Sequence, residues 1–205
     1  MAYVKYNHPI YSFPENYVQV FQNKFVANAA MEKEIVRKRM SNELTAQDVK
    51  ICEFVYEHTF ATYEMLANIS KINNDGHEEF RKKLDKLVLF RILNRFILAD
   101  DEKIKPLPDD ALYIYSLDMG GKYFLDHYSN INMSTWNIGA VGYCAAKVAR
   151  MLTGADFHAK LLASCPKKLK EFKCRDYRVG KDVANLSFEF KLDIYNNKTG
   201  QMTSR

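Results

Sequence analysis

Hydrophobic residues recur at helical spacing in three consecutive segments of the chain: 45–59, 62–69 and 78–90. Thr45 and Thr62 stand where the first two segments begin, and Asp48 follows Thr45 at the spacing of a capping box. The apolar residues of the third segment share one helical face and leave its charged residues on the other: Phe80, Leu84, Leu87 and Val88. The sequence therefore predicts three helices, the third after the polar turn at 70–76.

Two segments rich in β-branched and aromatic residues follow, and this composition favours strands: Arg91–Leu98 and Leu112–Leu117. Between them, the charged, proline-containing run Asp100–Asp110 is typical of an exposed loop. Asp118 is then expected to cap a further helix. Three helices followed by strand, loop and strand is the order of a winged helix-turn-helix, in which the third helix is the recognition helix.

The flanking segments extend this unit. Aromatic residues and prolines indicate an extended arm over residues 1–14, and an apolar stripe from Asn16 to Val36 predicts a helix with a basic end. Helical patterns at 135–152 and 156–164, separated by Thr153-Gly154, predict a helical hairpin. The remaining segments are expected to be a basic surface run, a strand, a turn and a frayed end: 166–181, 183–195, 196–200 and 201–205.

Composition fits a globular protein rather than a disordered one. Of the 205 residues, 47% are hydrophobic, and the formal net charge of +5 is compatible with a polyanionic partner. No run of about 18 apolar residues and no signal-like N-terminus occurs, so we expect a soluble, cytoplasmic protein without membrane contact. The predicted fold is α+β and mainly helical, with an N-terminal arm and helix, a winged helix-turn-helix domain, and a C-terminal helical hairpin with a short β element: residues 1–43, 44–128 and 129–205.

Basic residues on the third helix and on the loop are the predicted DNA contacts, because lysine and arginine neutralise phosphates while a helix reads the major groove. The helix supplies four of these candidates: His77, Arg81, Lys82 and Lys86. The wing supplies two: Lys103 and Lys105. A third basic cluster lies in the C-terminal run: Lys167, Lys168 and Lys170. We therefore predict non-catalytic binding of double-stranded DNA, with no cofactor and no metal.

One alternative is a metal-dependent nuclease. Glu189 and Lys191 are two residues apart on the last predicted strand, so their side chains share one face. Together with Asp176 or Asp182 they could hold a divalent cation that activates water. This chemistry requires a second strand paired with the first. No P-loop, GxGxxG, GxSxG or HExxH motif occurs. The histidines and cysteines are dispersed without metal-ligand or disulfide spacing, so the histidines are expected to be surface or packing residues: His8, His58, His77, His127 and His158.

Two further interpretations concern partners. Residues 134–164 form either a dimerisation surface that matches a two-fold operator, or a helix pair that completes the monomer core. Winged helices also serve as protein-interaction modules, such as adaptors or inhibitors. In that case the contact would be the aromatic N-terminal arm: Tyr3, Tyr6, Tyr11 and Phe13.

About half the chain carries a Leu-Thr helix start, an Arg-x-x-Leu-x-x-Leu third helix and a Tyr-x-Leu strand leading to glycine: Leu44–Asp48, Phe80–Leu87, Arg91–Leu93 and Tyr115–Leu125. In these features the chain resembles the winged-helix part of the replication-relaxation proteins, which plasmids and other mobile elements carry. The resemblance implies a DNA-binding role in replication, transfer or control of a plasmid, phage or other mobile element, as a regulator or a replication accessory factor.

Overall fold

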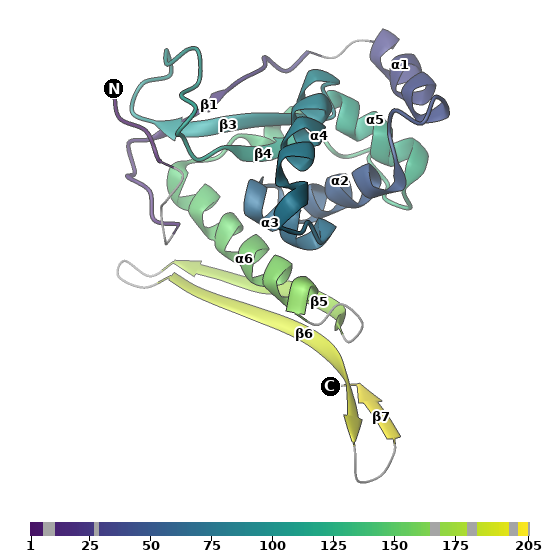
Figure 1. Cartoon of the computed structure of the whole chain (residues 1–205). Coiled ribbons are helices and arrows are strands. Elements are labelled where there is room, and N and C mark those ends of the chain that lie inside the picture. Colours follow the sequence, from purple (N-terminus) through teal and green to yellow (C-terminus); the bar gives the residue numbers. More distant parts are fainter. Residues whose placement is uncertain (6–10, 27–28, 165–168, 180–183, 197–200, 205) are drawn as a thin grey trace.

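The computed structural model describes residues 1–5, 11–26, 29–164, 169–179, 184–196 and 201–204 (Figure 1). Within these ranges the chain is α+β, with six α-helices, a four-stranded antiparallel sheet and a separate three-stranded sheet. None of the helices in these ranges combines the length and apolar character needed to cross a lipid bilayer.

The three central helices form where the sequence predicts them: α2 (Ala46–His58), α3 (Tyr63–Ser70) and α4 (His77–Leu89). At the start of α2, the Thr45 backbone N–H donates to Asp48 Oδ2 at 2.7 Å, as the capping-box spacing requires. A short 3-10 turn, Asn74–Gly76, leads into α4. The apolar face of α4 is buried, as predicted: Phe80, Leu84, Leu87 and Val88.

The four-stranded sheet contains the predicted hairpin and two strands that the sequence analysis did not predict. β3 (Leu93–Ala99) and β4 (Ile114–Leu117) pair antiparallel, as expected. β2 (Ala61–Thr62), between α2 and α3, pairs with β4. β1 (Val18–Phe21) pairs with β3, which gives the order β1-β3-β4-β2.

The expectation of a helix starting near Asn16 is wrong for its first part. Residues 18–21 instead pair with β3, from Val18 opposite Ala99 to Phe21 opposite Phe96, and Val20 is the buried residue of this strand. The edge of β3 is available for pairing, and these hydrogen bonds decide the local conformation. The helix α1 (Ala29–Met40) begins later, and Ile35 is buried on it.

Helix α5 (Met119–Tyr128) begins after Asp118, whose side chain accepts the Met119 backbone N–H, as predicted. Its two leading glycines are required by a close approach to the turn between α4 and β3. A Cβ at Gly121 would lie 2.3 Å from the Ile92 carbonyl oxygen. A Cβ at Gly120 would lie 2.6 Å from the Arg91 carbonyl oxygen, so no larger residue fits without a shift of the backbone.

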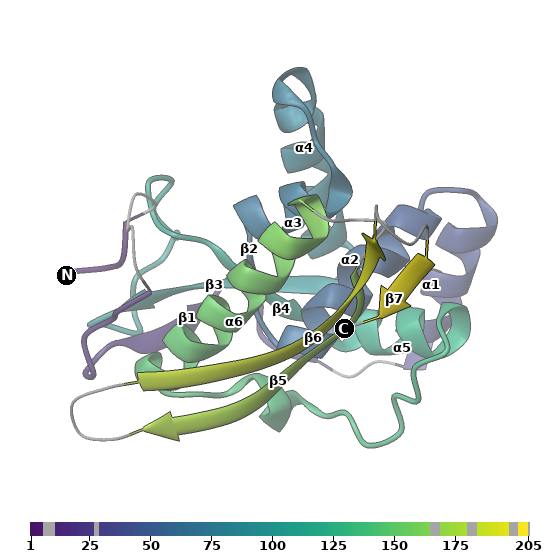
Figure 2. The same cartoon turned by 90° about the horizontal axis from the view of Figure 1, so that it is seen from below.

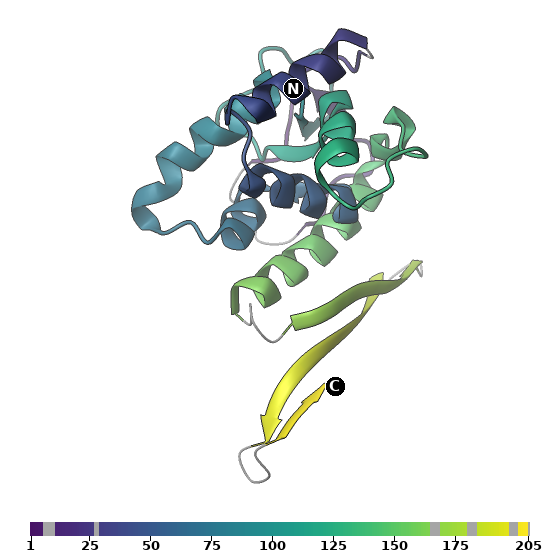
Figure 3. The same ribbon diagram turned by 90° about the vertical axis from the view of Figure 1, so that its right-hand side faces the viewer.

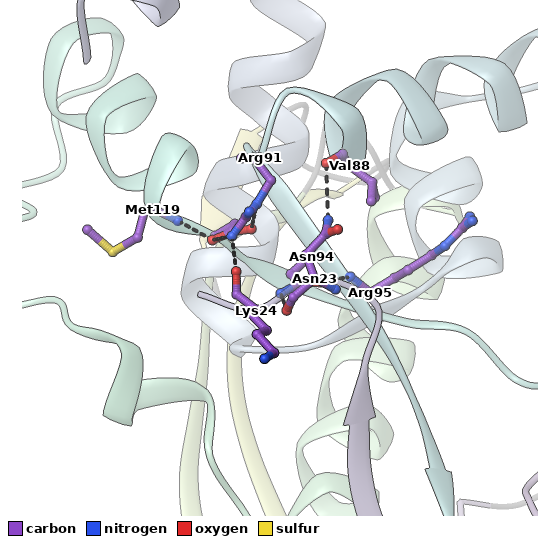
Figure 4. A network of polar contacts seen from close by, with 8 residues as sticks. Asn23, Lys24, Val88, Arg91, Asn94, Arg95 and Met119 are labelled. Carbon is purple, nitrogen blue, oxygen red and sulfur yellow. Dashed lines mark hydrogen bonds and ion pairs between the residues drawn. The ribbon is translucent and has the colours of Figure 1, made fainter. Parts of the chain in front are cut away.

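A polar network joins this turn to the segment after β1 (Figure 4). Arg91 Nε donates to the fully buried Asp118 carboxylate at 2.6 Å, and Arg91 Nη2 donates to the Lys24 carbonyl. Asn94 Nδ2 donates to the Asn23 carbonyl at 2.9 Å, and the Asn23 N–H donates to Asn94 Oδ1 at 3.2 Å. The network therefore fixes residues 23–24 against the start of β3 and the cap of α5.

The predicted C-terminal helical hairpin is wrong. After the 3-10 turn Ile138–Val141, one continuous helix, α6 (Ala145–Ser164), passes through Thr153 and Gly154. Its buried face is uninterrupted: Val148, Leu152, Ala155 and Ala159. A glycine inside a helix costs only about 1 kcal/mol, and the packing of this face against α3 and α2 outweighs that cost.

Beyond α6, the chain forms a second antiparallel sheet in the order β5-β6-β7, and Figures 1 and 3 show its first two strands running beneath α6. β6 (Ala184–Asn196) confirms the predicted strand. β5 (Leu169–Val179) is formed by the basic run that the sequence analysis assigned to a solvated surface, and β7 (Gln201–Ser204) replaces the expected frayed end. Both segments form strands because they pair with β6. The sequence of a charged run or a short tail does not by itself indicate such a partner.

The main hydrophobic core is continuous from Val4 to Ala159, so it crosses residues 43 and 128, where the domain boundaries were expected. The described part of the N-terminal arm belongs to it. Tyr3 bridges to Ala99, Lys5 bridges to Ala111, and Val4 and Phe13 are buried. The described part of the arm therefore packs against the body of its own chain.

Candidate nucleic-acid interface

Helix α4 projects from the body of the protein (Figure 2), and its amphipathic sequence leaves one long polar face in solvent. The three cations predicted to contact DNA are exposed on it: Arg81, Lys82 and Lys86. Lys83 is different, because its Nζ lies 3.1 Å from the buried Asp48 carboxylate at the start of α2. One lysine of α4 therefore fixes the helix to α2, while three basic residues remain at the surface.

Acidic residues on and near α4 moderate this positive charge. Lys82 pairs with Glu78 one turn earlier at 2.6 Å, and both side chains are largely exposed. Asp85 pairs with Arg95 of β3, also at 2.6 Å. Exposed ion pairs contribute at most about 1 kcal/mol to stability, so a phosphate can compete with Glu78 for Lys82.

The predicted wing loop presents its two lysines outward. Lys103 and Lys105 are exposed, whereas Ile104 between them is buried in a small cluster with Val20 and Ile97. The buried Ile104 side chain attaches the loop to the body of the protein between its two exposed lysines. Both lysines are therefore held at the surface of the loop.

A cavity of about 750 Å³ separates α4 from the end of this loop. Its charged lining residues are three cations and three anions: Lys5, Arg81, Arg95, Asp85, Asp109 and Asp110. Two ion pairs neutralise four of these charges, since Asp85 binds Arg95 and Lys5 binds Asp110 at 3.2 Å. The charges that line the cavity therefore sum to about zero, with Arg81 and Asp109 outside these two ion pairs.

Three tyrosines and Ala111 form the rest of the cavity wall: Tyr63, Tyr113 and Tyr115 are the tyrosines. The Arg81 guanidinium lies 4.6 Å from the Tyr63 ring centre, and that of Arg95 lies 4.6 Å from the Tyr113 ring centre. Burial raises the pKa of Tyr115 to about 12, and burial also raises the pKa of Tyr113. Both phenols are protonated at neutral pH, so they can donate hydrogen bonds or stack but cannot act as bases.

His77, the remaining candidate on α4, is half-buried. Its Nδ1 lies 2.7 Å from the Tyr63 hydroxyl, and that hydroxyl also donates to the His77 carbonyl at 3.0 Å. The contact joins the first residue of α4 to the first residue of α3. His77 thus positions the helix, in addition to any contact with a ligand.

The C-terminal candidates are only partly described. Lys167, Lys168 and Asp182 lie outside the described residues, and Lys170 lies on β5. The nuclease hypothesis required a strand paired with the one that carries Glu189 and Lys191, and β5 is that strand. In the register of the pair, Asp176 is opposite Ser187 and Lys173 is opposite Glu189.

Sequence reasoning missed a histidine pair on the other side of α2. His58 ends α2 and His158 lies on α6, and both side chains are buried. His58 Nε2 and His158 Nδ1 are 2.7 Å apart, so one ring donates a hydrogen bond to the other. Burial lowers the pKa of His58 to about 3 and that of His158 to about 4, which keeps both rings neutral at pH 7. The residues are 100 positions apart, so no local spacing could have indicated the pair.

Comparison with known proteins gives no further assignment. No protein-family model, no curated protein sequence and no solved structure matches the chain.

Proposed function

We propose that this protein is a winged-helix protein that binds duplex DNA without catalysis, with α4 in the major groove and the β3–β4 loop as the wing. The observation that carries the proposal is the exposed row Arg81, Lys82 and Lys86 on a projecting helix, beside a loop that presents Lys103 and Lys105. Basic side chains on a recognition helix and on an adjacent wing are the usual contacts of this motif.

The order and pairing of the elements support the recognition-helix assignment. α2, α3 and α4 precede the β3–β4 hairpin, and the short strand β2 between α2 and α3 closes the sheet against β4. α4 has 13 residues and is thus roughly 20 Å long, which is enough to lie across a major groove about 12 Å wide.

The distribution of charge supports binding to the phosphate backbone more than reading of base edges. The cations of α4 are interleaved with Glu78, Glu79 and Asp85, so the helix as a whole is not strongly positive. Five exposed cations across the helix and the loop can still release counterions from about five phosphates. We therefore expect affinity that falls steeply with salt and depends only moderately on sequence.

Charge reversal tests this proposal. Binding of the full chain to a fluorescent duplex should weaken at least about tenfold in the Lys82→Glu, Lys86→Glu double variant, because two phosphate contacts become repulsive. Lys160→Glu is the matched control, since Lys160 also makes an exposed i,i+4 ion pair, with Asp156 on α6. Equal affinity of the double variant and the wild-type protein would refute the assignment of α4.

A second candidate, a protein-interaction module, is favoured by the near-neutral, tyrosine-lined cavity between α4 and the loop. Its three tyrosines and two arginines resemble the amphipathic surfaces that dominate protein interfaces: Tyr63, Tyr113, Tyr115, Arg81 and Arg95. A partner seated there would bind with weak salt dependence, and Tyr113→Ala would weaken it more than Lys82→Glu. DNA binding predicts the opposite order.

A further inference from the structure

A group of three potential metal ligands lies where α2 meets α6. His58 Nε2 and His158 Nδ1 are 2.7 Å apart, and one ligand atom from each of Glu57, His58 and His158 lies within 4.8 Å of the others. Among the residues that the structure describes, this is the one group of three or more histidine, cysteine or acidic side chains that is so compact.

The carboxylate gives this group access to solvent. Glu57 is exposed, and it lines a cleft of about 530 Å³ together with Tyr56, Thr135 and Trp136. The two histidines behind it are buried against Phe54, whose ring centre is 4.6 Å from that of His58. Of the three side chains, Glu57 is the one that lines the cleft and can meet a cation from solvent first, while His58 and His158 are only 8% and 7% exposed.

We propose that Glu57, His58 and His158 form a zinc site that joins α2 to α6. Two imidazole nitrogens and one carboxylate oxygen are a ligand set that Zn²⁺ accepts in tetrahedral geometry, with a water molecule in the fourth position. Zn–N bonds of about 2.0–2.1 Å at a tetrahedral angle place the two nitrogens roughly 3.3 Å apart. From their hydrogen-bonded position the two nitrogens must separate by about 0.6 Å, and the rings must also turn, because both lone pairs then point at the ion instead of along the line between the nitrogens.

Binding also requires one proton to move. In the hydrogen-bonded pair, one of the two facing nitrogens carries a proton, and the metal needs the lone pairs of both. The ring that donates must transfer this proton to its other nitrogen, through water, and no net proton is released from the two neutral histidines. Metal binding thus replaces one N–H···N hydrogen bond with two coordinate bonds.

The site is independent of the proposed DNA interface. It lies on α2 and α6, whereas the DNA contacts lie on α4 and the β3–β4 loop. The bound ion would replace the hydrogen bond between the helices with a stronger link, and it would fix α6, from which the chain continues to β5. Zinc should therefore raise the thermal stability of the whole chain.

Titration of the chelator-treated, full-length protein with Zn²⁺ tests the proposal. We expect saturable binding of one ion per chain and, with Co²⁺ as a spectroscopic probe, the visible absorption of a tetrahedral complex. His158→Gln should weaken zinc binding by more than about 100-fold, because the loss of a direct ligand exceeds the 10–100-fold effect of losing an outer-sphere partner. His127→Gln is the control, since His127 pairs with Glu32 on the surface, 2.7 Å away, and should bind zinc as the wild-type protein does.

The buried variant could fail to fold, and a second variant keeps the test decisive. Glu57→Gln changes an exposed side chain, so circular dichroism should show an unchanged fold while zinc affinity falls at least tenfold and the zinc-dependent rise in melting temperature disappears. Absence of saturable binding by the wild-type protein would overturn the proposal. Wild-type affinity in Glu57→Gln would overturn it equally, because the ion would then be bound elsewhere.

Discussion

Replacing Arg91 with methionine should lower the free energy of unfolding by about 4 kcal/mol. Arg91 forms an ion pair with Asp118, a fully buried carboxylate at the start of α5, with Nε and Oδ2 2.6 Å apart. Removing one partner of a buried pair costs about 3–5 kcal/mol, because the other charge stays buried. We use the lower end of this range, about 3 kcal/mol, because Asp118 still accepts the Met119 N–H in the variant. The lost hydrogen bond from Arg91 to the Lys24 carbonyl adds about 1 kcal/mol.

Urea unfolding followed by circular dichroism measures this loss. For an m-value near 2 kcal/mol/M, the midpoint should fall by roughly 2 M at pH 7. Adding Asp118→Asn to the variant should recover about half of the loss, because the asparagine is neutral and its oxygen can still accept the Met119 N–H. A loss below about 1 kcal/mol, or no recovery in the double variant, would refute the argument that a buried charge is responsible.

The pH dependence gives an independent check. Burial raises the pKa of Asp118, and the hydrogen bond and charge of Arg91 offset only part of that effect. Loss of Arg91 raises this pKa further, so the folded state holds a proton more strongly than the unfolded chain does. Stability then falls as the pH rises past the unfolded value of about 3.8 and through the raised pKa. The deficit of the Arg91→Met variant should therefore be largest at pH 7 and shrink on acidification.

Three further predictions concern packing, capping and the wing. Gly121→Ala should lower stability by about 3 kcal/mol or more in thermal unfolding, since its Cβ would lie 2.3 Å from the Ile92 carbonyl oxygen; a loss under 1 kcal/mol would contradict this close approach. Asp48→Ala should cost about 2 kcal/mol by urea unfolding, because it removes the capping box of α2 and leaves Lys83 without its carboxylate, whereas Gln47→Ala should cost much less. Lys103→Glu with Lys105→Glu should weaken duplex binding and reduce the slope of log affinity against log salt by about 2, and an unchanged slope would exclude the wing as a phosphate contact.

The helical centre of the fold could be predicted because its signals are local. The capping box at Thr45 and Asp48, the spacing of Phe80, Leu84, Leu87 and Val88, and the cap at Asp118 each act within one or two turns. Local signals of this kind do not depend on the rest of the chain. The need for glycine at positions 120 and 121 is not local, because it comes from the close approach of α5 to the turn at Arg91 and Ile92.

The errors arose where the decisive interactions join distant residues. Val18–Phe21 forms a strand because it pairs with β3, and Gln201–Ser204 forms a strand because it pairs with β6. Gly154 stays helical because the neighbouring residues of α6 are buried against α3 and α2. The same applies to the site. The exposure of Arg81, Lys82 and Lys86 follows from helical period, but the pairing of Asp85 with Arg95 and of His58 with His158 needs the three-dimensional fold.

The most direct test of the account is the salt dependence of duplex DNA binding by the full chain. Five phosphate contacts, from Arg81, Lys82, Lys86, Lys103 and Lys105, predict a slope of log affinity against log salt of about −4.5. The same titration of the Lys82→Glu, Lys86→Glu variant should give a slope of about −2.7. No binding at low salt, or a slope near zero in the wild-type protein, would contradict the proposal that this fold presents a DNA-binding surface.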